Sequence, residues 1–474
     1  MAPEQEPRRL IIVSNRLPLS VKRSDGGYKS SLSSGGLVTS LSGLTKSTQF
    51  IWFGWPGIEV NDPTEREKVS KSLAEHHAVG IFLDNALANA HYNNFSNSIL
   101  WPILHYQSGM TFDDGPWQAY QKVNELFADA VAKEARKGDL IWVHDYHLML
   151  LPKLLRERLV KQGNNCAIGF SLHTPFPASD FWRALPVRNA MIEGLLSSDL
   201  IGFHTDEYKQ NFIGTCVNLM GAHTGVPNRI QYKDRLVEAG TFVVGIDPQK
   251  FDDTLSKPEV QNRIKELEER YKDVHVIIGV DRLDYIKGLT HKLKGYDRFL
   301  DDHPELKNKV LLIQVAVPSR EDVKEYQDLE TEISTLSGKI NGKHATPDGS
   351  PLLYMHRSIP FEELTAMYSI ADACLLTSSR DGMNLVSFEY VACQAKRHGV
   401  LVLSEFAGAS VFMKGGSVNF HPANTAELAQ SIHKAVKMDG KERKERYEKL
   451  NEFINTNTSA EWGKKFIESL SRRL

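Results

Sequence analysis

The chain has 474 residues, of which 41% are hydrophobic and 24% are charged, and its formal net charge is −2. This length exceeds what one ordinary hydrophobic core supports and indicates two or three domains. The near-zero charge argues against a nucleic-acid-binding protein, because no excess of basic residues is present to neutralise a phosphate backbone.

The cysteines and the apolar segments of the sequence indicate where in the cell the protein is located. The four cysteines have no Cys-x-x-Cys spacing, which favours reduced, buried thiols over disulfides or zinc ligands. The opening segment MAPEQEPRRL lacks the apolar core of a signal peptide, and no segment approaches the roughly 20 apolar residues that span a bilayer. We therefore expect a soluble, cytoplasmic protein.

Short apolar, β-branched runs alternate along the chain with segments of helical periodicity. Strands that are apolar on both faces and alternate with helices are typical of parallel α/β sheets. Helices are predicted at 117–135 and 148–159, among others. In chain order, the predicted strands are 10–13, 140–143, 168–172, 200–203, 242–244, 274–280, 310–317, 373–377 and 400–403.

The strands form two series, separated near 245–248 and by a charged helical segment at 263–272. This pattern predicts an α/β protein with two doubly wound, Rossmann-like domains that face a cleft. The expected domains are 1–248, 249–455, and a C-terminal helix in 456–474 that packs on the first domain. A single large α/β domain with a helical appendage is the alternative.

Basic residues follow one strand of the second series. Arg282 and Lys287 lie in a predicted turn after the strand 274–280, where both could point into the cleft. Two cations at that position would neutralise the charge that develops on a diphosphate leaving group. An isolated Arg/Lys pair is more often a pair of surface charges, and the position at a strand end favours a functional role here.

An acidic segment follows the strand 373–377. Gly382 permits a tight turn, Asp381 can accept hydrogen bonds from sugar hydroxyls, and Glu389 resembles the acidic residue that holds ribose hydroxyls in nucleotide-binding folds. The alternative is a turn aspartate and a solvent-facing glutamate. In isolation this segment is ambiguous.

The first series contributes glycine, imidazole and aromatic groups. Paired glycines at 35–36 precede a helix-like run and could bind a diphosphate through backbone amides, although most such pairs are only turns. Asp145 and His173 follow two predicted strands and should reach one sheet edge. Aromatic faces for a sugar ring are offered by Trp52, Trp55, Tyr92 and Trp101.

These segments together resemble the trehalose-6-phosphate synthase family, in its fungal single-domain form, over nearly the whole chain. The stretches that carry the resemblance are VSNRLP at 13–18, SGGL at 34–37, WFGWPG at 52–57, YNNFSNSILWPILHY at 92–106, WVHDYHLMLLP at 142–152, SLHTPFP at 171–177, VDRLDYIKG at 280–288, PSR at 318–320 and SRDGMNLVSFEYVA at 379–392. The resemblance implies a GT-B-type glycosyltransferase that moves glucose from UDP-glucose to glucose 6-phosphate with retention of configuration.

The resemblance also implies the roles of individual residues. For UDP-glucose they are Gly36, His173, Arg282, Lys287, Asp381, Gly382, Met383, Asn384, Leu385 and Glu389. For glucose 6-phosphate they are Arg16, Trp55, Tyr92, Trp101, Asp145 and Arg320, with Trp52 as an alternative to Trp55. Asp145, His173, Arg282, Lys287 and Asp381 are the expected catalytic group, in which Asp145 orients the acceptor or acts as a general base.

No cofactor or metal is expected, because the sequence has no Asp-x-Asp and no His/Cys cluster with metal-ligand spacing. The resemblance suggests a homo-oligomer and a trehalose-6-phosphate phosphatase as partner. Three other functions are weighed against synthase activity: a related retaining transferase, a non-catalytic subunit that senses sugar phosphates, and a trehalose-6-phosphate phosphatase. The first would lack the acceptor segments, and the second would be expected to have lost the donor-site charges. A phosphatase would need an Asp-x-Asp nucleophile.

Overall fold

The structure is a computed structural model that describes residues 8–24, 27–32, 50–321 and 323–474. It divides into two compact units, one formed by Met1–Val244 with Ser459–Leu474 and the other by Gly245–Thr458. The divisions expected from the sequence, at 248 and 455, lie within a few residues of these limits. We call the two parts the first unit and the second unit.

The first unit is built on an eight-stranded sheet in the order β5-β4-β1-β6-β7-β8-β10-β9. All neighbours are parallel except β9 and β10, which form an antiparallel pair. Strands β2 and β3 form a separate two-stranded hairpin, which lies between β1 and β4 in the sequence. The strands are β1 (Leu10–Arg16), β2 (Leu19–Ser24), β3 (Gly27–Leu32), β4 (Phe50–Trp55), β5 (Ala78–Gly80), β6 (Leu140–His144), β7 (Ala167–Ser171), β8 (Leu200–Phe203), β9 (Arg229–Tyr232) and β10 (Arg235–Thr241).

Helices of the first unit begin with side-chain caps at several points. Asp113, for example, accepts a hydrogen bond from the backbone N–H of Gly115 at the start of α5, whose buried stripe includes Val123, Phe127 and Val131. The helices are α2 (Pro63–Ala74), α3 (Asn85–Asn89), the π-helix η2 (Ala90–Leu100), α4 (Trp101–Leu104), α5 (Asp114–Glu134), η3 (Tyr146–Leu148), α6 (Leu151–Lys161), α7 (Ser179–Trp182), α8 (Arg188–Leu195), α9 (Asp206–Met220) and α19 (Ser459–Ser471).

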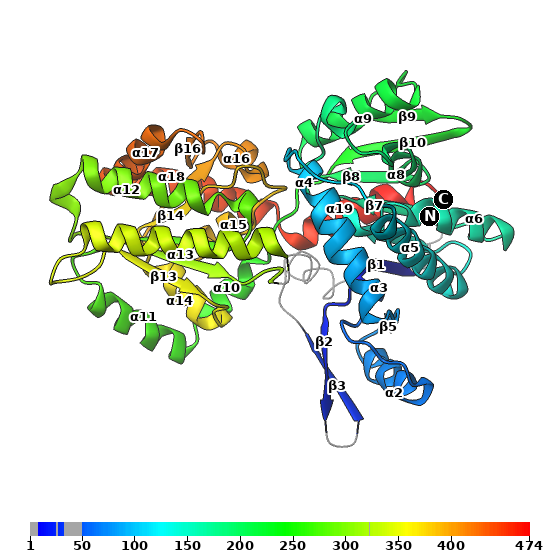
Figure 1. Cartoon of the computed structure of the whole chain (residues 1–474), viewed down its shortest axis with the longest axis horizontal. Helices are drawn as coiled ribbons and strands as arrows, with labels where there is room; N and C mark the ends of the chain where they lie inside the picture. Colours follow the sequence, from blue (N-terminus) through cyan, green and yellow to red (C-terminus); the bar gives the residue numbers. More distant parts are fainter. Residues whose placement is uncertain (1–7, 25–26, 33–49, 322) are drawn as a thin grey trace, which may run out of the picture. The chain divides into compact units, whose positions relative to one another are not determined.

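The last helix, α19, belongs to the first unit, and Figure 1 shows it in red beside β7 and β8. Phe466 stacks on Trp142 of β6 with ring centroids 4.3 Å apart, and Trp462 lies 4.9 Å from the same ring. At the other end of the helix, Arg8 donates a hydrogen bond to the carbonyl of Ser471. The buried aromatic pair explains why this short helix stays on the sheet.

The second unit contains a parallel six-stranded sheet in the order β13-β12-β11-β14-β15-β16. Alternate residues of its strands point into one core, since Ala373 with Leu375 and Val400 with Val402 are all buried there. That core also receives α12, α13 and α17. The strands are β11 (His275–Arg282), β12 (Val310–Val317), β13 (Leu352–His356), β14 (Ala373–Leu376), β15 (Val400–Ser404) and β16 (Val418–Phe420).

The remaining helices of the second unit contact one another in a separate group that includes α10, α11, α14, α15 and α18. The sheet is therefore covered on both faces, as a doubly wound fold requires. The bounds are α10 (Pro248–Leu255), α11 (Pro258–Arg270), η4 (Tyr285–Lys287), α12 (Leu289–Asp302), η5 (Pro304–Leu306), α13 (Lys324–His344), α14 (Phe361–Ile370), α15 (Val386–Ala392), α16 (Gly408–Met413), α17 (Thr425–Lys437) and α18 (Gly440–Thr456).

One strand predicted from the sequence is wrong. The apolar pattern predicts a strand at 242–244, but β10 ends at Thr241 and these residues have no regular structure. The N–H of Phe242 still donates to the carbonyl of Phe203, after which the chain leaves the sheet. Val244 is buried and the two residues before it are half-buried without a strand ladder, a case in which short apolar runs mislead.

Within the described residues, no helix is both long and apolar enough to cross a membrane.

Candidate functional site

The predicted residues of the first unit lie at the carboxyl ends of adjacent parallel strands. Arg16 ends β1, Trp55 ends β4, Asp145 directly follows β6, and His173 follows β7. These strands are neighbours in the order β4-β1-β6-β7, so their carboxyl ends form one continuous edge of the sheet. Ligands of open α/β sheets bind at this edge.

Arg16 and Trp55 are adjacent at this edge. They are paired in register, and the Arg16 guanidinium lies 5.3 Å from the centroid of the Trp55 ring. Gly57, with φ of 81°, completes the arrangement, because a Cβ built there would lie 2.3 Å from Nη2 of Arg16. A larger residue at position 57 would therefore displace the guanidinium from this place.

The structure also separates the two tryptophans of the WFGW segment. Trp52 is buried and its indole N–H donates to Oγ of Ser14, whereas Trp55 is half-buried beside Arg16. Within the described part of the chain, Nε1 of Trp55 has no hydrogen-bond partner. Trp55 rather than Trp52 is thus placed to contact a ligand.

Tyr92 and Trp101 are positioned by the π-helix η2, an uncommon element that often marks functional sites. Tyr92 stacks on His147 with centroids 5.4 Å apart and an interplanar angle of 8°. Trp101 is only 6% exposed and packs against His105 and Tyr146. A sugar ring would therefore meet Tyr92 more readily than a face of Trp101.

Asp145 adopts a conformation that is costly for a non-glycine residue, with φ of 73°. Its backbone N–H donates to the carbonyl of Ser171, and its Oδ1 accepts from the N–H of His173 at 3.2 Å. These bonds join the ends of β6 and β7. Oδ2 lies 4.0 Å from Nδ1 of His147, so the carboxylate is surrounded by polar groups of this edge.

His173 lies between two other histidines that sequence reasoning did not single out. Its Nε2 is 3.0 Å from Nδ1 of His144, and its Nδ1 is 3.1 Å from Nε2 of His204. Burial lowers the pKa of His173 well below its ordinary value, because the ring is removed from water, and the neighbouring imidazoles lower it further. His173 is therefore neutral at physiological pH.

In the second unit, Arg282 and Arg320 share one carboxylate. Nη2 of Arg282 is 3.6 Å from Oδ2 of Asp284, and Nη1 of Arg320 is 3.4 Å from the same oxygen. Oδ1 of Asp284 accepts from the N–H of Ile286. The side chain of Arg282 is 43% exposed, whereas that of Arg320 is 2% exposed and also bonds to Tyr326. Sequence patterns did not identify Asp284, although it stands in the same VDRLD segment as Arg282.

Lys287 and Asp381 form an ion pair in which Nζ is 2.5 Å from Oδ2, and both side chains are largely buried. Asp381 also accepts from Oγ of Ser378 at 3.1 Å and from Nδ2 of Asn384 at 3.0 Å. Gly288, with φ of 64°, allows this approach, because a Cβ there would lie 2.2 Å from the carbonyl of Thr377. The turn after β11 thus packs directly on the end of β14.

Glu389 lies in α15, which directly follows the predicted backbone segment Gly382, Met383, Asn384 and Leu385. Its Oε2 accepts from the hydroxyl of Tyr368 at 3.3 Å. Burial raises the pKa of Glu389, because the charged carboxylate is poorly solvated. Two further hydroxyl donors from a ribose would stabilise the charged form.

Three of the predicted residues have a strained backbone. Nine non-glycine residues of the described chain have positive φ, and Asp145, Arg320 and Asn384 are three of them. Such conformations cost about 1–3 kcal/mol and persist mainly where the surrounding structure enforces them, often at ligand sites. Gly36, the remaining predicted residue, lies outside the described residues.

One group of metal-binding residue types occurs among the described residues, formed by Asp297, Asp301 and His344. Sequence spacing could not reveal it, because the group joins α12 to α13. Lys343 lies 3.0 Å from Asp297 and 2.6 Å from Asp301, so its ammonium already balances both carboxylates. This group contains none of the predicted site residues.

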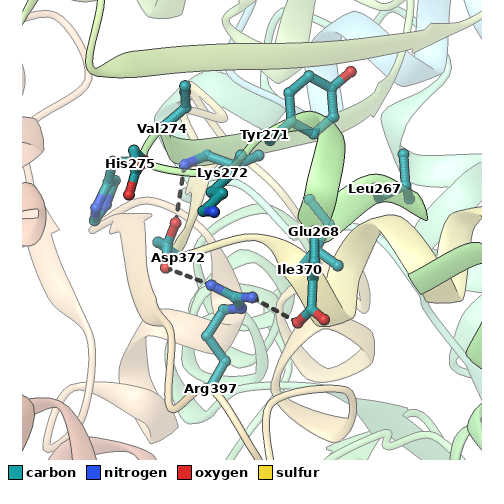
Figure 2. A pocket seen from close by; sticks show the side chains of 11 residues that line it. Leu267, Glu268, Tyr271, Lys272, Val274, His275, Ile370, Asp372 and Arg397 are labelled. Carbon is teal, nitrogen blue, oxygen red and sulfur yellow. Dashed lines mark hydrogen bonds and ion pairs between the residues drawn. The ribbon is translucent and has the colours of Figure 1, made fainter. Parts of the chain in front are cut away.

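A cavity of about 340 Å³ in the second unit lies at the amino-terminal start of β11, the end opposite to Arg282 (Figure 2). Figure 2 shows Arg397 between Asp372 and Glu268, at 3.1 Å and 3.0 Å respectively. Asp372 also accepts from the N–H of Val276. The charges here neutralise one another and connect α11 to the sheet, so we regard the cavity as structural.

Comparison with known proteins identifies the family of the chain. The model of glycosyltransferase family 20 matches residues 8–472. An Aspergillus niger protein named alpha,alpha-trehalose-phosphate synthase [UDP-forming] 1 is 52% identical over 473 residues, which are 99% of this chain and 90% of that protein.

Solved structures are similar over almost the full length. The E. coli trehalose-6-phosphate protein bound with UDP-2-fluoro glucose has a TM-score of 0.88 at 32% identity, covering 98% of this chain and 99% of that one. A Burkholderia xenovorans alpha,alpha-trehalose-phosphate synthase (UDP-forming), solved with glucose-6-phosphate, has a TM-score of 0.86 at 30% identity, covering 98% and 100%. The N-terminal domain of Candida albicans trehalose-6-phosphate phosphatase has a TM-score of 0.89 at 29% identity, covering 100% and 99%. The fold is accordingly of the GT-B type, and the chain belongs to glycosyltransferase family 20.

Proposed function

We propose that this protein is a UDP-forming alpha,alpha-trehalose-phosphate synthase, which transfers glucose from UDP-glucose to glucose 6-phosphate. The observation that carries the proposal is the 52% identity to a protein of that name over 99% of this chain. Relatives solved with a UDP-glucose analogue and with glucose-6-phosphate support the choice of the two substrates.

On the donor side, the reaction breaks the bond between the glucose C1 and the diphosphate. Arg282 and Lys287 are the cations that would stabilise the charge left on the diphosphate, a contribution that is largest when the groups are held in place beforehand. Asp381 orients the Lys287 ammonium in the structure. Glu389 would accept hydrogen bonds from the ribose hydroxyls.

On the acceptor side, Arg16 and Arg320 would bind the 6-phosphate, for which the planar guanidinium is well suited. Tyr92 and Trp55 would contact the sugar, and Asp145 would orient its anomeric hydroxyl. The new C1–O bond forms on the face that the diphosphate leaves, and the hydroxyl proton passes to the leaving phosphate oxygen. Retention of configuration follows without an enzymic nucleophile.

The fold alone does not separate a synthase from the domain of a phosphatase, since the Candida albicans domain has the same architecture. The charges expected at the donor site support a synthase, because Arg282, Lys287, Asp381 and Glu389 are all present. A non-catalytic sensing subunit would have no use for cations at the leaving group. The 474 residues contain no Asp-x-Asp, the nucleophile motif that a phosphatase would need.

Several finer points belong to the same proposal. We expect the reaction to need no metal, because Arg282 and Lys287 supply positive charge at the diphosphate. We also expect a homo-oligomer, a phosphatase partner and a cytoplasmic location. The location is supported by the four cysteines, all of which are free and buried.

The decisive experiment incubates the purified protein with UDP-glucose and glucose 6-phosphate, with and without EDTA, and measures UDP and the sugar product. UDP release that depends on glucose 6-phosphate and matches formation of trehalose 6-phosphate would establish the function. Binding of both ligands without UDP release would instead favour the sensing subunit. Absence of glucose 6-phosphate binding would overturn the acceptor assignment.

A further inference from the structure

Three buried histidines form a continuous hydrogen-bonded chain at the ends of β6, β7 and β8. Nδ1 of His144 is 3.0 Å from Nε2 of His173, and Nδ1 of His173 is 3.1 Å from Nε2 of His204. Nδ1 of His204 is 3.3 Å from the carbonyl oxygen of Phe242. We call this series the histidine chain.

The last hydrogen bond of the histidine chain determines which nitrogen donates and which accepts in each of the others. A carbonyl oxygen only accepts, so His204 carries its proton on Nδ1 and its Nε2 is an acceptor. His173 must therefore donate from Nδ1, and its Nε2 must accept from Nδ1 of His144. All three neutral rings are then Nδ1-protonated, and Nε2 of His144 is a bare acceptor with no partner among the described residues.

The surroundings favour the neutral form. The ring centroid of Trp462 in α19 lies 6.2 Å from that of His144 and 5.8 Å from that of His173. The ring centroid of Trp142 lies 4.5 Å from that of His144. Burial lowers the pKa of His144 to about 3 and that of His204 to about 4. The acidic group in direct contact with the chain is Asp145, and it accepts from the backbone N–H of His173 rather than from the ring.

Protonation of His173, the middle ring, would also disrupt the hydrogen bonds of the histidine chain. An imidazolium at position 173 would direct Nε2–H toward the Nδ1–H of His144, so that two donors would face each other unless His144 moved its own proton to Nε2. The series therefore holds the middle ring in one tautomer and one orientation. Both ring nitrogens of His173 are used within the protein.

We propose that His144 and His204 are positioning residues that hold His173 as a neutral, Nδ1-protonated imidazole at the donor-glucose side of the site. This inference rests on the proposed synthase function for its kinetic consequence, but not for the tautomer. Because both of its ring nitrogens are bonded within the protein, His173 neither accepts the proton of the acceptor hydroxyl nor adds positive charge beside the donor. The proton is then left to the leaving phosphate or to Asp145.

The tautomer is measured directly by long-range ¹H–¹⁵N NMR of ¹⁵N-histidine-labelled protein, with assignments from single-site variants. We expect His173 to show the Nδ1-protonated pattern at pH 5.5 and at pH 7.5. His144→Phe should leave that pattern in place, because the acceptor of the Nδ1–H remains. His204→Phe should abolish it, and this asymmetry would not arise from a general loss of packing.

Kinetics supply the second measurement. His204→Phe should lower kcat/KM for UDP-glucose about tenfold, the size expected when one buried hydrogen bond is lost. His204→Gln should stay within about twofold of wild type, because the glutamine oxygen reaches the position of Nε2. His344→Gln in the second unit, a buried histidine bonded to Asp297, serves as the control for loss of an imidazole.

Two results would overturn the proposal. The first is an Nε2-protonated or cationic His173 in the wild type at pH 7.5. The second is a His204→Phe variant with unchanged ¹⁵N shifts and unchanged kcat/KM for UDP-glucose. If the NMR pattern is found but no trehalose 6-phosphate is made, the tautomer stands and the proposed function is the part that fails.

Discussion

The end of β6, β7 and β8 differs in kind from the end of β11, β12 and β14. The first is built on neutral imidazoles, His144, His173 and His204, which are hydrogen-bonded in series. The second is built on ion pairs, Lys287 with Asp381 and both arginines with Asp284. Neutral groups orient without attracting counterions, whereas fixed charges stabilise charge that develops. The histidines of the first end are thus suited to orienting neutral groups, and the fixed charges of the second end to stabilising an anion.

The comparison predicts that acid weakens the first unit more than the second, and this is the largest effect expected. Burial lowers the pKa of His91 and His204 to about 4 and that of His144 to about 3, whereas the unfolded chain has the ordinary value of 6.5. The unfolded state therefore binds more protons below pH 6.5, so stability is complete above 6.5 and is lost as pH falls toward 4.

At pH 5 the loss is about 2 kcal/mol of unfolding free energy for each such histidine. Amide hydrogen exchange at pH 7 and pH 5, corrected for the pH dependence of the intrinsic exchange rates, measures this loss of stability in each region. Peptides that cover 140–204 should lose more protection than peptides that cover 277–316. Equal losses in both units would contradict the contrast.

The ionic character of the second unit is tested by the buried pair of Lys292 and Asp281, which are 0% and 1% exposed. Lys292→Ala should lower the free energy of unfolding by about 3–5 kcal/mol, because it leaves a buried carboxylate unpaired. Lys294→Ala, on the exposed side of the same helix, is the control and should change stability by less than about 0.5 kcal/mol. Denaturant unfolding that gives similar values for both would show that the pair is not essential.

Lys287→Ala tests the charge assigned to the leaving group. We expect kcat to fall about 10²–10³-fold, the loss typical of removing one preorganised electrostatic group. Lys324→Ala, which removes an exposed lysine paired with Asp328, is the control and should leave kcat unchanged. Near-wild-type turnover of Lys287→Ala would contradict the leaving-group role.

Gly57→Ala tests the acceptor side of the first unit with the smallest change. Its Cβ would displace the Arg16 guanidinium, so KM for glucose 6-phosphate should rise about tenfold while KM for UDP-glucose changes little. Gly109→Ala has the same backbone strain, with φ of 93°, but its Cβ would meet no atom within 4 Å. If both variants had the same KM values, backbone strain rather than Arg16 would be responsible.

The strand ends were the part of the site that sequence patterns indicated well. Apolar runs followed by Arg282, Asp145 or Asp381 identified the carboxyl edges, because a parallel strand must be apolar and its ligand groups must follow it. The expectation failed at 242–244, where half-buried and buried apolar residues lie outside any strand. Short strands with glycine and aromatic residues, such as β4, were not recognised, since WFGW reads equally well as a binding segment.

By itself the sequence determined the α/β class, the family and the residue types at the strand ends, since these depend on local periodicity and on contiguous motifs. Only the tertiary structure showed that Trp55 rather than Trp52 lies beside Arg16, and that Asp284 joins two arginines that are far apart in the chain. It also aligned His144, His173 and His204, which come from three different strand ends. Such contacts depend on the order of strands in the sheet, and that order is decided by long-range packing.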